Sequence, residues 1–338
     1  MDKIHAVAGI EVSKNELLVL VRNGATTSPL RRIENHAAGR QAVVRLLRKA
    51  AGRGRIRVAL EPTGTYSLDL ALQLHAETSV ELIVPNPKAV RRFAEALMVR
   101  DKRDPQDATV LLEYAARMPD AAWQAPSEAA LRLRAITRRM ASLREQITAE
   151  KNRLHADAQT ATSPQVVRET TTAVIHAMES ALKALAQEAK AMIAADPTLG
   201  RRFALLLSVP GIAQRSALRI LGELVVLPAN MTERQWVSHA GLYPTEHSSG
   251  SSVRRPGRIG KAGCRALRTA LFMPALVAAR WAPPVRAFYQ RLIGRGLAKL
   301  QALVAVMRKL LHAIHGMFAS DTPFDNHRFT PTQLEATT

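Results

Sequence analysis

The sequence has one cysteine, few aromatic side chains and too few acidic residues to balance its basic ones. The single cysteine, Cys264, excludes an internal disulfide and a cysteine-based zinc site. No run of apolar residues has the uninterrupted length that a membrane span needs, and the first residues lack the layout of a signal peptide. These absences predict a cytoplasmic protein, with no membrane partner.

Other absences narrow the chemistry. The histidines show no metal-ligand spacing, and no glycine-rich turn leads into Gly-Lys-Ser or Gly-Lys-Thr, so the sequence does not support ATP dependence. Aromatic residues make up 4% of the chain, which fits the holding of nucleic-acid backbones better than base stacking. Lysine and arginine number 48 against 28 acidic residues, a net charge of +20. That balance predicts a polyanionic partner, most simply nucleic acid.

Four of the acidic residues stand where a metal-dependent phosphoryl-transfer enzyme places its ligands. Glu11 lies in a run of apolar and β-branched residues that predicts a strand of a hairpin, and Glu61 closes a second short apolar run before a Pro-Thr-Gly turn. Asp104 and Asp107 are three residues apart at the start of a helical pattern and therefore share a face. Strand ends and a helix start can aim four carboxylates at one point.

Such a carboxylate cluster suits a two-metal site. Two divalent ions about 4 Å apart can hold the attacking and leaving oxygens of a phosphodiester, and Mg²⁺ prefers carboxylate ligands. A lone acid is more often a solvated surface charge. Glu11 differs because an acid within an apolar strand is costly to bury. We therefore predict that the four residues bind Mg²⁺, or Mn²⁺ in its place.

The sequence pattern predicts four segments. Residues 1–125 begin with antiparallel strands and continue as alternating strands and helices, which is the RNase H-like α/β pattern. Residues 126–196 predict two long helices that form a hairpin or coiled coil, acting either as a spacer or as a contact between protomers. Residues 197–321 predict a mainly α domain that ends in one long apolar helix over residues 288–318, and residues 322–338 form a tail.

The third segment holds two further signals. A helix, a Pro-Gly-Ile turn at Gly211 and a second helix resemble a helix–hairpin–helix element, whose glycine turn presents backbone N–H groups to a phosphate; a buried turn is the alternative. A serine run over residues 248–252, otherwise a plain loop, precedes a set of cations able to orient a phosphodiester and stabilise charge on it. These predicted nucleic-acid contacts are Arg254, Arg255, Arg258, Lys261, Arg265 and Arg268.

The segments GIEVSK, LEPTGTY and KRDPQDATVLLEYA resemble, in order and spacing, the acidic motifs of insertion-sequence transposases with a RuvC-like Asp-Glu-Asp-Asp domain. That family includes the bridge-RNA-guided serine recombinases. Its first acidic position is usually aspartate, whereas Glu11 stands here; the extra methylene keeps the charge and shifts a ligated ion by about an ångström. The C-terminal half resembles the family too, and its catalytic serine corresponds to Ser249.

The resemblance implies a function. Ser249 attacks a DNA phosphate and forms a transient phosphoserine link, which preserves the phosphodiester energy for rejoining without ATP. It also implies a composite site between protomers of a dimer or tetramer, a structured guide RNA that pairs with DNA, and use in the bacterial nucleoid.

Two other hypotheses stay open. A Holliday-junction-type nuclease would use the same four acids with water as the nucleophile, and Ser249 would then only contact phosphate. A non-catalytic nucleic-acid-binding protein that has lost its activity would explain the glutamate at position 11.

Overall fold

The computed structural model describes residues 4–99, 104–249, 253–260 and 262–326, and between residues 245 and 258 it describes only backbone. The chain divides into two compact units, Met1–Ala125 and Pro126–Thr338. We describe each unit by itself.

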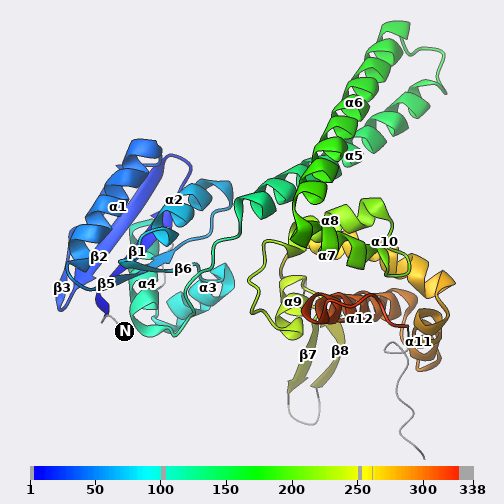
Figure 1. The fold of residues 1–338 in the computed structure, drawn as a ribbon. Coiled ribbons are helices and arrows are strands. Elements are labelled where there is room, and N and C mark those ends of the chain that lie inside the picture. Colours follow the sequence, from blue (N-terminus) through cyan, green and yellow to red (C-terminus); the bar gives the residue numbers. More distant parts are fainter. Residues whose placement is uncertain (1–3, 100–103, 250–252, 261, 327–338) are drawn as a thin grey trace, which may run out of the picture. The chain divides into compact units, whose positions relative to one another are not determined.

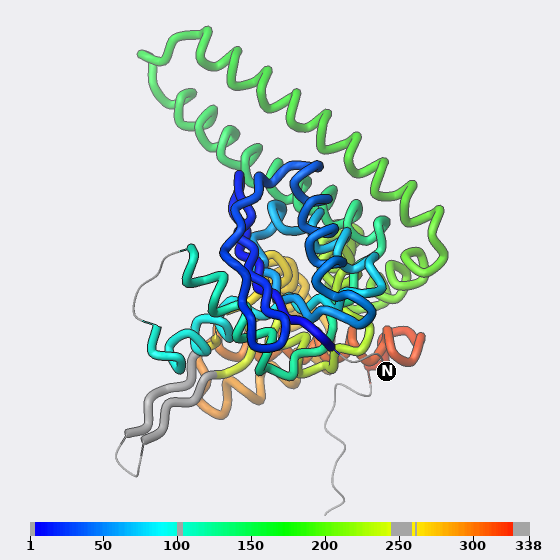
Figure 2. The backbone as a smooth tube through the Cα atoms, turned by 90° about the vertical axis from the view of Figure 1, so that its left-hand side faces the viewer, coloured from blue at the N-terminus to red at the C-terminus, as the bar shows by residue number. Residues whose placement is uncertain are grey.

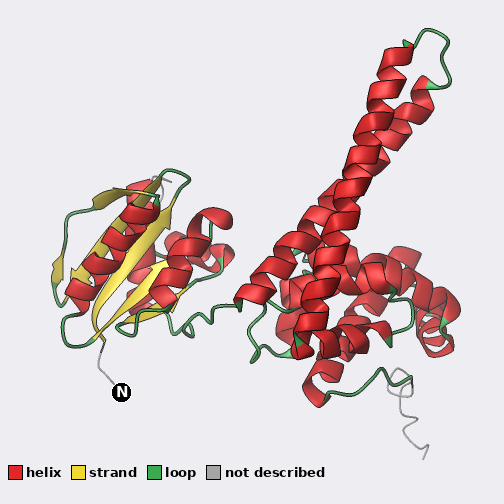
Figure 3. Ribbon diagram, turned by 45° about the horizontal axis from the view of Figure 1, so that its top comes forward, coloured by secondary structure: helices red, strands yellow, loops and turns green. Residues whose placement is uncertain are grey.

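The first unit is built on a mixed sheet of six strands (Figures 1 and 3). Its order is β3-β2-β1-β5-β6, and β4 also pairs with β2. The pairing of β1 with β2 is antiparallel, whereas β1, β5 and β6 run parallel. The strands are β1 (Ile4–Val12), β2 (Glu16–Asn23), β3 (Thr26–Thr27), β4 (Arg31–Glu34), β5 (Arg55–Leu60) and β6 (Val80–Ile83).

Helices cover the sheet and make it an α/β unit. They are α1 (Ala37–Ala51), α2 (Thr65–His75), α3 (Pro87–Ala96) and α4 (Asp104–Arg117). Along β1 the side chains alternate: Ala6, Ala8 and Ile10 join a core cluster with residues of α1 and α2, while Gly9 faces α4. The predicted alternation of strands and helices is present in the structure, with ends shifted by a few residues.

The second unit begins with two long helices, α5 (Glu128–Asp157) and α6 (Gln165–Ala195), which lie side by side (Figures 1 and 2). They run antiparallel, since Arg132 pairs with Glu188 and Lys151 with Glu179. The segment ends at residue 196 as predicted, and the Asp196 side chain accepts the N–H groups of Thr198 and Leu199 that open the next helix.

The rest of the unit is mainly helical around one core. It contains α7 (Pro197–Leu207), α8 (Gln214–Leu224), α9 (Glu233–His239), a hairpin of β7 (Pro244–Ser249) and β8 (Val253–Ile259), α10 (Arg265–Trp281), α11 (Pro283–Gly294) and α12 (Lys299–Ser320). The first turns of α5 join this core through Leu133 and Met140.

The last part of the unit differs from the sequence prediction. The single helix predicted over residues 288–318 is wrong: the chain turns after α11, where Gly296 has φ +88 and Leu297 N–H donates to Leu292 O. A side chain is strained at such a φ, so the glycine permits the break.

Helix α12 is the most apolar long helix of the second unit that the structure describes. It is long and apolar enough, by length and composition, to cross a membrane, and it is the one such helix in the described part of the chain. Its buried residues include Val306, Leu310 and Ile314, which pack in the core of the second unit. The fold therefore uses it as a core helix.

Candidate active site

The position of Glu11 follows from close packing two residues earlier. A Cβ at Gly9 would collide with Ala108 O and Leu112 N, so β1 touches the backbone of α4 at this point. Alternate residues of a strand share a face, and Glu11 is therefore the next side chain of β1 on the α4 side. It is only 9% exposed.

Glu61 lies beside Glu11 on the neighbouring strand. The parallel register pairs Ile10 with Leu60, and Glu61 N–H donates to Ile10 O at 3.1 Å. Because paired residues of adjacent strands point to the same face, the two glutamates leave the sheet on the α4 side.

Asp104 and Asp107 occupy the first turn of α4. The structure thus has both aspartates at the N-terminal end of the helix, where the sequence pattern predicts them. Acidic side chains are favourable there because they oppose the positive end of the helix dipole. Asp104 is exposed, Asp107 is half-buried, and Ala108 faces β1 directly after them.

These carboxylates act on one another. The pKa of Glu11 is raised to about 7, first by burial and then by the negative charges of Asp104, Glu61, Asp107 and Glu16. The structure thus brings the four predicted residues into one electrostatic field. In the residues that the structure describes, no three acids, histidines or cysteines stand close enough together to enclose a metal ion. Both findings hold, because charges interact over longer distances than ligand bonds span.

A cleft of about 580 Å³ opens beside two of these residues. Glu61 and Asp107 contribute to one wall, and Val90, Arg91 and Glu95 of α3 to another. The acids therefore line a recess of the first unit that another molecule can enter.

Ser249 is the last residue of β7. The hairpin register sets it opposite Val253, with Ser248 opposite Arg254 and His247 opposite Arg255. The serine run therefore does not begin as a plain loop, because Ser248 and Ser249 are paired in a strand. The backbone brings the serines next to the basic strand β8, while the side chains of Arg254, Arg255 and Arg258 and all of Lys261 fall outside the described structure.

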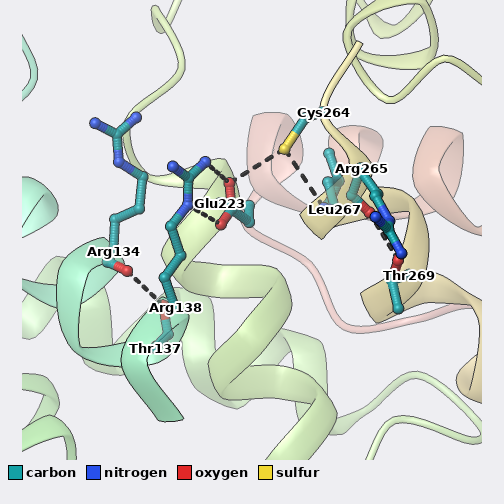
Figure 4. Close-up of polar contacts among 8 residues, drawn as sticks. All are labelled: Arg134, Thr137, Arg138, Glu223, Cys264, Arg265, Leu267 and Thr269. Atoms are coloured by element: carbon teal, nitrogen blue, oxygen red, sulfur yellow. Dashed lines mark hydrogen bonds and ion pairs between the residues drawn. The ribbon is translucent and has the colours of Figure 1, made fainter. Parts of the chain in front are cut away.

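A buried acid that the sequence analysis missed supports the segment after this hairpin (Figure 4). Glu223 of α8 is 4% exposed and accepts two hydrogen bonds from Arg138 of α5, at 2.7 and 2.8 Å. Cys264 Sγ donates to the same carboxylate at 3.3 Å and accepts Leu267 N–H at the start of α10. Like Glu11, Glu223 is an acid within an apolar run, and that signal could have found it.

The ion pair with Arg138 decides the charge state of Glu223 in this network. Burial alone would favour the neutral acid, yet the hydrogen bonds and charge of Arg138 lower the pKa of Glu223. Burial raises the pKa of the Cys264 thiol. The network is an anion bound by an arginine with a neutral thiol beside it, which suits a structural role.

The other predicted nucleic-acid contacts have mixed surroundings. Arg265 is exposed at the start of α10, whereas Arg268 donates to Ala240 O at 2.7 Å and so anchors the backbone. Gly211 has φ +86, and a Cβ there would collide with Pro274 O of α10. Both the backbone angle and the packing against α10 require glycine at this position, and neither tests a contact of the turn with phosphate.

Two family models match the chain. The model described as "Transposase IS116/IS110/IS902 family" matches residues 203–290, which include Ser249. A model described as "Transposase", of the DEDD type of IS110 elements, matches residues 8–161, which include the four acids.

Individual relatives agree with the family models. The pilin gene-inverting proteins of Moraxella bovis and Moraxella lacunata are each 30% identical to the chain over 275 residues, covering 80% of this chain and 82% of theirs. An uncharacterized 43.6 kDa protein of insertion element IS110 from Streptomyces coelicolor is 28% identical over 166 residues, 48% of this chain and 41% of its own.

Proposed function

Since the chain belongs to the IS116/IS110/IS902 family of transposases, we propose that it cuts and rejoins DNA with four carboxylates that bind divalent ions and with Ser249 as the nucleophile. The family resemblance seen in the sequence is confirmed, and with it a DNA recombinase of the transposase type. The DEDD match also implies that the mixed sheet of the first unit is RuvC-like. The observation that carries the proposal is the strand register that sets Glu11 beside Glu61, on the face of the sheet that packs against α4, whose first turn holds Asp104 and Asp107.

The donor set fits a divalent metal. Glu11, Glu61, Asp104 and Asp107 offer oxygen ligands only, which suits Mg²⁺ or Mn²⁺. The pKa of Glu11 is raised by burial and further by the neighbouring carboxylates, and a bound cation would offset both effects. Bound ions would supply charge stabilisation at a phosphodiester. The carboxylates of β1, β5 and α4 would orient the ions toward the cleft beside Glu61 and Asp107.

Ser249 is proposed to carry the covalent step. Its Oγ loses a proton to a base and forms a bond to the DNA phosphorus, while the bond from phosphorus to one strand end breaks and that oxygen gains a proton. A hydroxyl of another strand end then attacks the phosphoserine, restores a phosphodiester and releases the serine. The exchange is neutral in bonds and in electrons, so it needs no ATP. The position of Ser249 beside the basic strand β8 supports this role.

The nuclease alternative is less favoured. Two relatives are named for gene inversion, and inverting a segment requires strands to be rejoined as well as cut. A serine link provides for rejoining, whereas water as the nucleophile does not.

Further parts of the proposal rest on the resemblance. We propose that a structured RNA guides the enzyme, that it works as a dimer or tetramer in the bacterial cytoplasm and nucleoid, and that α5 and α6 form a coiled-coil contact between protomers. Residues 126–196 and 197–321 would then act as an assembly segment and a serine-bearing DNA-binding segment. In the latter, α7 and α8 serve as a helix–hairpin–helix-like element.

The test is a covalent adduct. Incubation with cognate element DNA in Mg²⁺ should give a protein–DNA link that survives denaturation, and Ser249→Ala should abolish both the link and rejoining. Ser248→Ala is the matched control, because it removes the neighbouring hydroxyl of the same strand and should leave the link in place. Rejoining by Ser249→Ala at the normal rate would eliminate the serine mechanism.

The inactive-protein alternative has its own outcome. If the natural chain shows no cleavage in Mg²⁺ and Glu11→Asp restores it, the protein is a binding protein that lost its activity through position 11. Cleavage by the natural chain rejects that alternative.

A further inference from the structure

Helices α5 and α8 pack along a seam within the second unit. Near one end of the seam, Thr137 of α5 lies directly against Gly222 of α8, where a Cβ would collide with the threonine side chain. One residue further along each helix, Arg138 binds Glu223 with two hydrogen bonds (Figure 4). These contacts fix the register of the two helices.

The register brings three arginines together further along the seam. Seven residues make about two turns of a helix and return to the same face. Arg144 is seven residues after Thr137, and Arg215 is seven residues before Gly222, so the two face each other if the helices run antiparallel. This arrangement agrees with the electrostatics of Arg144, because its pKa is lowered first by partial burial and then by the positive charges of Arg215 and Arg219, which are therefore near it. Arg219 stands one turn from Arg215 on α8.

The arginine triad, Arg144, Arg215 and Arg219, has no acid to balance it. In residues 4–99, 104–249, 253–260 and 262–326, no side chain makes an ion pair or hydrogen bond with any of the three guanidinium groups. The acid of the seam, Glu223, is one turn beyond Arg219 and is already bound by Arg138. Glu145 follows Arg144 in sequence, which places it about 100° around the helix.

The triad opposes stability in three ways. Like charges are packed together, which weakens the fold. Arg144 is partly buried, which costs its charge some hydration. Arg215 lies in the first turn of α8, where no acid stands and the N-cap, Ala213, gives no side-chain hydrogen bond, so its charge meets the positive end of the helix dipole. An arrangement that costs stability without a partner in its own unit indicates a ligand.

We propose that Arg144, Arg215 and Arg219 form a binding site for the phosphate backbone of duplex DNA. The inference deepens the proposed function and rests on it, since DNA is the substrate of a recombinase. Arginine guanidinium groups are planar forks that match phosphate oxygens. Contacts to phosphate fix position without reading sequence, so the site holds DNA of any sequence.

Two arginines of the triad, Arg215 and Arg219, lie on the same helix that supports the segment after the Ser249 hairpin. Glu223 of the same helix holds Cys264, just after the hairpin that carries Ser249. Duplex DNA bound at the triad is therefore held by the same packed unit that positions the serine strand. The triad is a positioning surface for the DNA.

The test compares two triple variants of the full-length protein, each with the same loss of three positive charges. One is Arg144→Gln, Arg215→Gln, Arg219→Gln. The control is Arg132→Gln, Arg153→Gln, Arg201→Gln, which removes exposed arginines that each have a carboxylate partner. Binding of short duplex DNA of random sequence is measured in EDTA over a series of salt concentrations.

We expect the triad variant to bind at least ~10-fold more weakly at moderate salt, and the slope of log affinity against log salt to fall by about three, close to one for each lost phosphate contact. The control should weaken binding less than ~3-fold. A lysine triple at the same positions should recover most of the affinity, because it keeps the charges. The melting temperature of the triad variant should not fall, since repulsion is removed.

Several results would overturn the site. Equal weakening in both glutamine variants would show that only net charge matters. A loss seen with duplex RNA but not with DNA would assign the triad to a different partner, and a lysine triple as weak as the glutamine triple would show a structural role. EDTA prevents cleavage, so the binding result does not depend on Ser249. If the glutamine triad variant binds DNA as the unaltered protein does, and the Ser249 adduct forms normally, only the triad site is rejected. If the triad variant loses binding as expected but no adduct forms at Ser249, only the serine nucleophile is rejected.

Discussion

The two units each hold a buried glutamate, and the two glutamates have opposite surroundings. Glu11 in β1 is 9% exposed and faces other carboxylates, which help to raise its pKa to about 7. Glu223 in α8 is 4% exposed and accepts two hydrogen bonds from Arg138, which lower its pKa. Burial is similar, so the neighbours decide whether a buried acid strains the fold or stabilises it.

This difference distinguishes a functional site, at Glu11, from a structural contact, at Glu223. An acid kept among acids is a cost to folding, and the cost is understandable where a cation or substrate offsets it. An acid bound by arginine completes a contact between helices α5 and α8 and needs no ligand. The arginine triad, also between α5 and α8, resembles the Glu11 cluster with the sign of charge reversed, because its three cations have no acidic partner.

The largest expected effect concerns Glu11 and activity. Glu11→Gln should lower DNA cleavage by ~100-fold or more, as removal of one charge-stabilising group does in other active sites, while the free energy of unfolding should stay level or rise because repulsion is relieved. Glu16→Gln is the control, since Glu16 also acts on Glu11 but is paired with Arg32 on the neighbouring strand. Cleavage assays in Mg²⁺ and urea unfolding measure the two effects. Equal activity in both variants would contradict a ligand role for Glu11.

For Glu223 the expected effect is on the stability of the fold, whereas for Glu11 it is on activity. Glu223→Gln should destabilise the second unit by about 3 kcal/mol, because Arg138 loses its charged partner. This is the lower end of the cost of breaking a buried pair, since the Arg138 side chain is half-exposed. Glu188→Gln breaks an exposed pair with Arg132 and should cost less than ~1 kcal/mol. Hydrogen exchange of α8 and α10 peptides locates the change. A loss no greater than that of the control would show that the seam depends on packing alone.

The smallest expected effect is a difference in pH dependence. The folded pKa of Glu11 is raised, so the folded protein binds more protons between pH 4.5 and about 7, and the stability of the first unit should fall as pH rises through that range. The full shift corresponds to about 3 kcal/mol, and solvent in the cleft should reduce it to ~1–2 kcal/mol.

Glu223 should behave in the opposite way, because its folded pKa is lowered. Its contribution is present above pH 4.5 and is lost as the pH falls further. Hydrogen exchange of β1 and α8 peptides, corrected for the intrinsic effect of pH on exchange, measures both units in one sample. If β1 protection is flat from pH 4.5 to 7, the four acids are not coupled; if Mg²⁺ restores the protection lost at pH 7, the coupling and the metal role are both supported.

Much of the first unit could be predicted from local pattern. The strands at Glu11 and Glu61 alternate apolar residues, and parallel pairing then places both acids on one edge. The start of α4 is local as well, since the sequence pattern places Asp104 and Asp107 at the beginning of a helix and the structure has them in its first turn. The position of α4 relative to Glu11 could not be predicted, because it depends on the close packing of α4 against Gly9 of β1.

The second unit was harder to predict where contacts join distant parts of the chain. The local pattern predicts a turn at Gly211, but it does not reveal that α10, more than sixty residues later in the sequence, packs against that turn. Arg138 and Glu223 are 85 residues apart and form one of the close charged contacts of the unit. The break at Gly296 interrupts a continuous apolar pattern, and hydrophobic periodicity alone does not reveal a turn inside such a run.

The sequence by itself determined the elements of the first unit, the family and the set of acidic and basic residues, because these depend on composition, spacing and local periodicity. Only the tertiary structure decided which charges meet. It placed Glu11 among carboxylates, bound Glu223 to Arg138, and left Arg144, Arg215 and Arg219 without an acid. The physical reason is that charge–charge energies depend on distance and burial, and helix packing sets both across long separations in sequence.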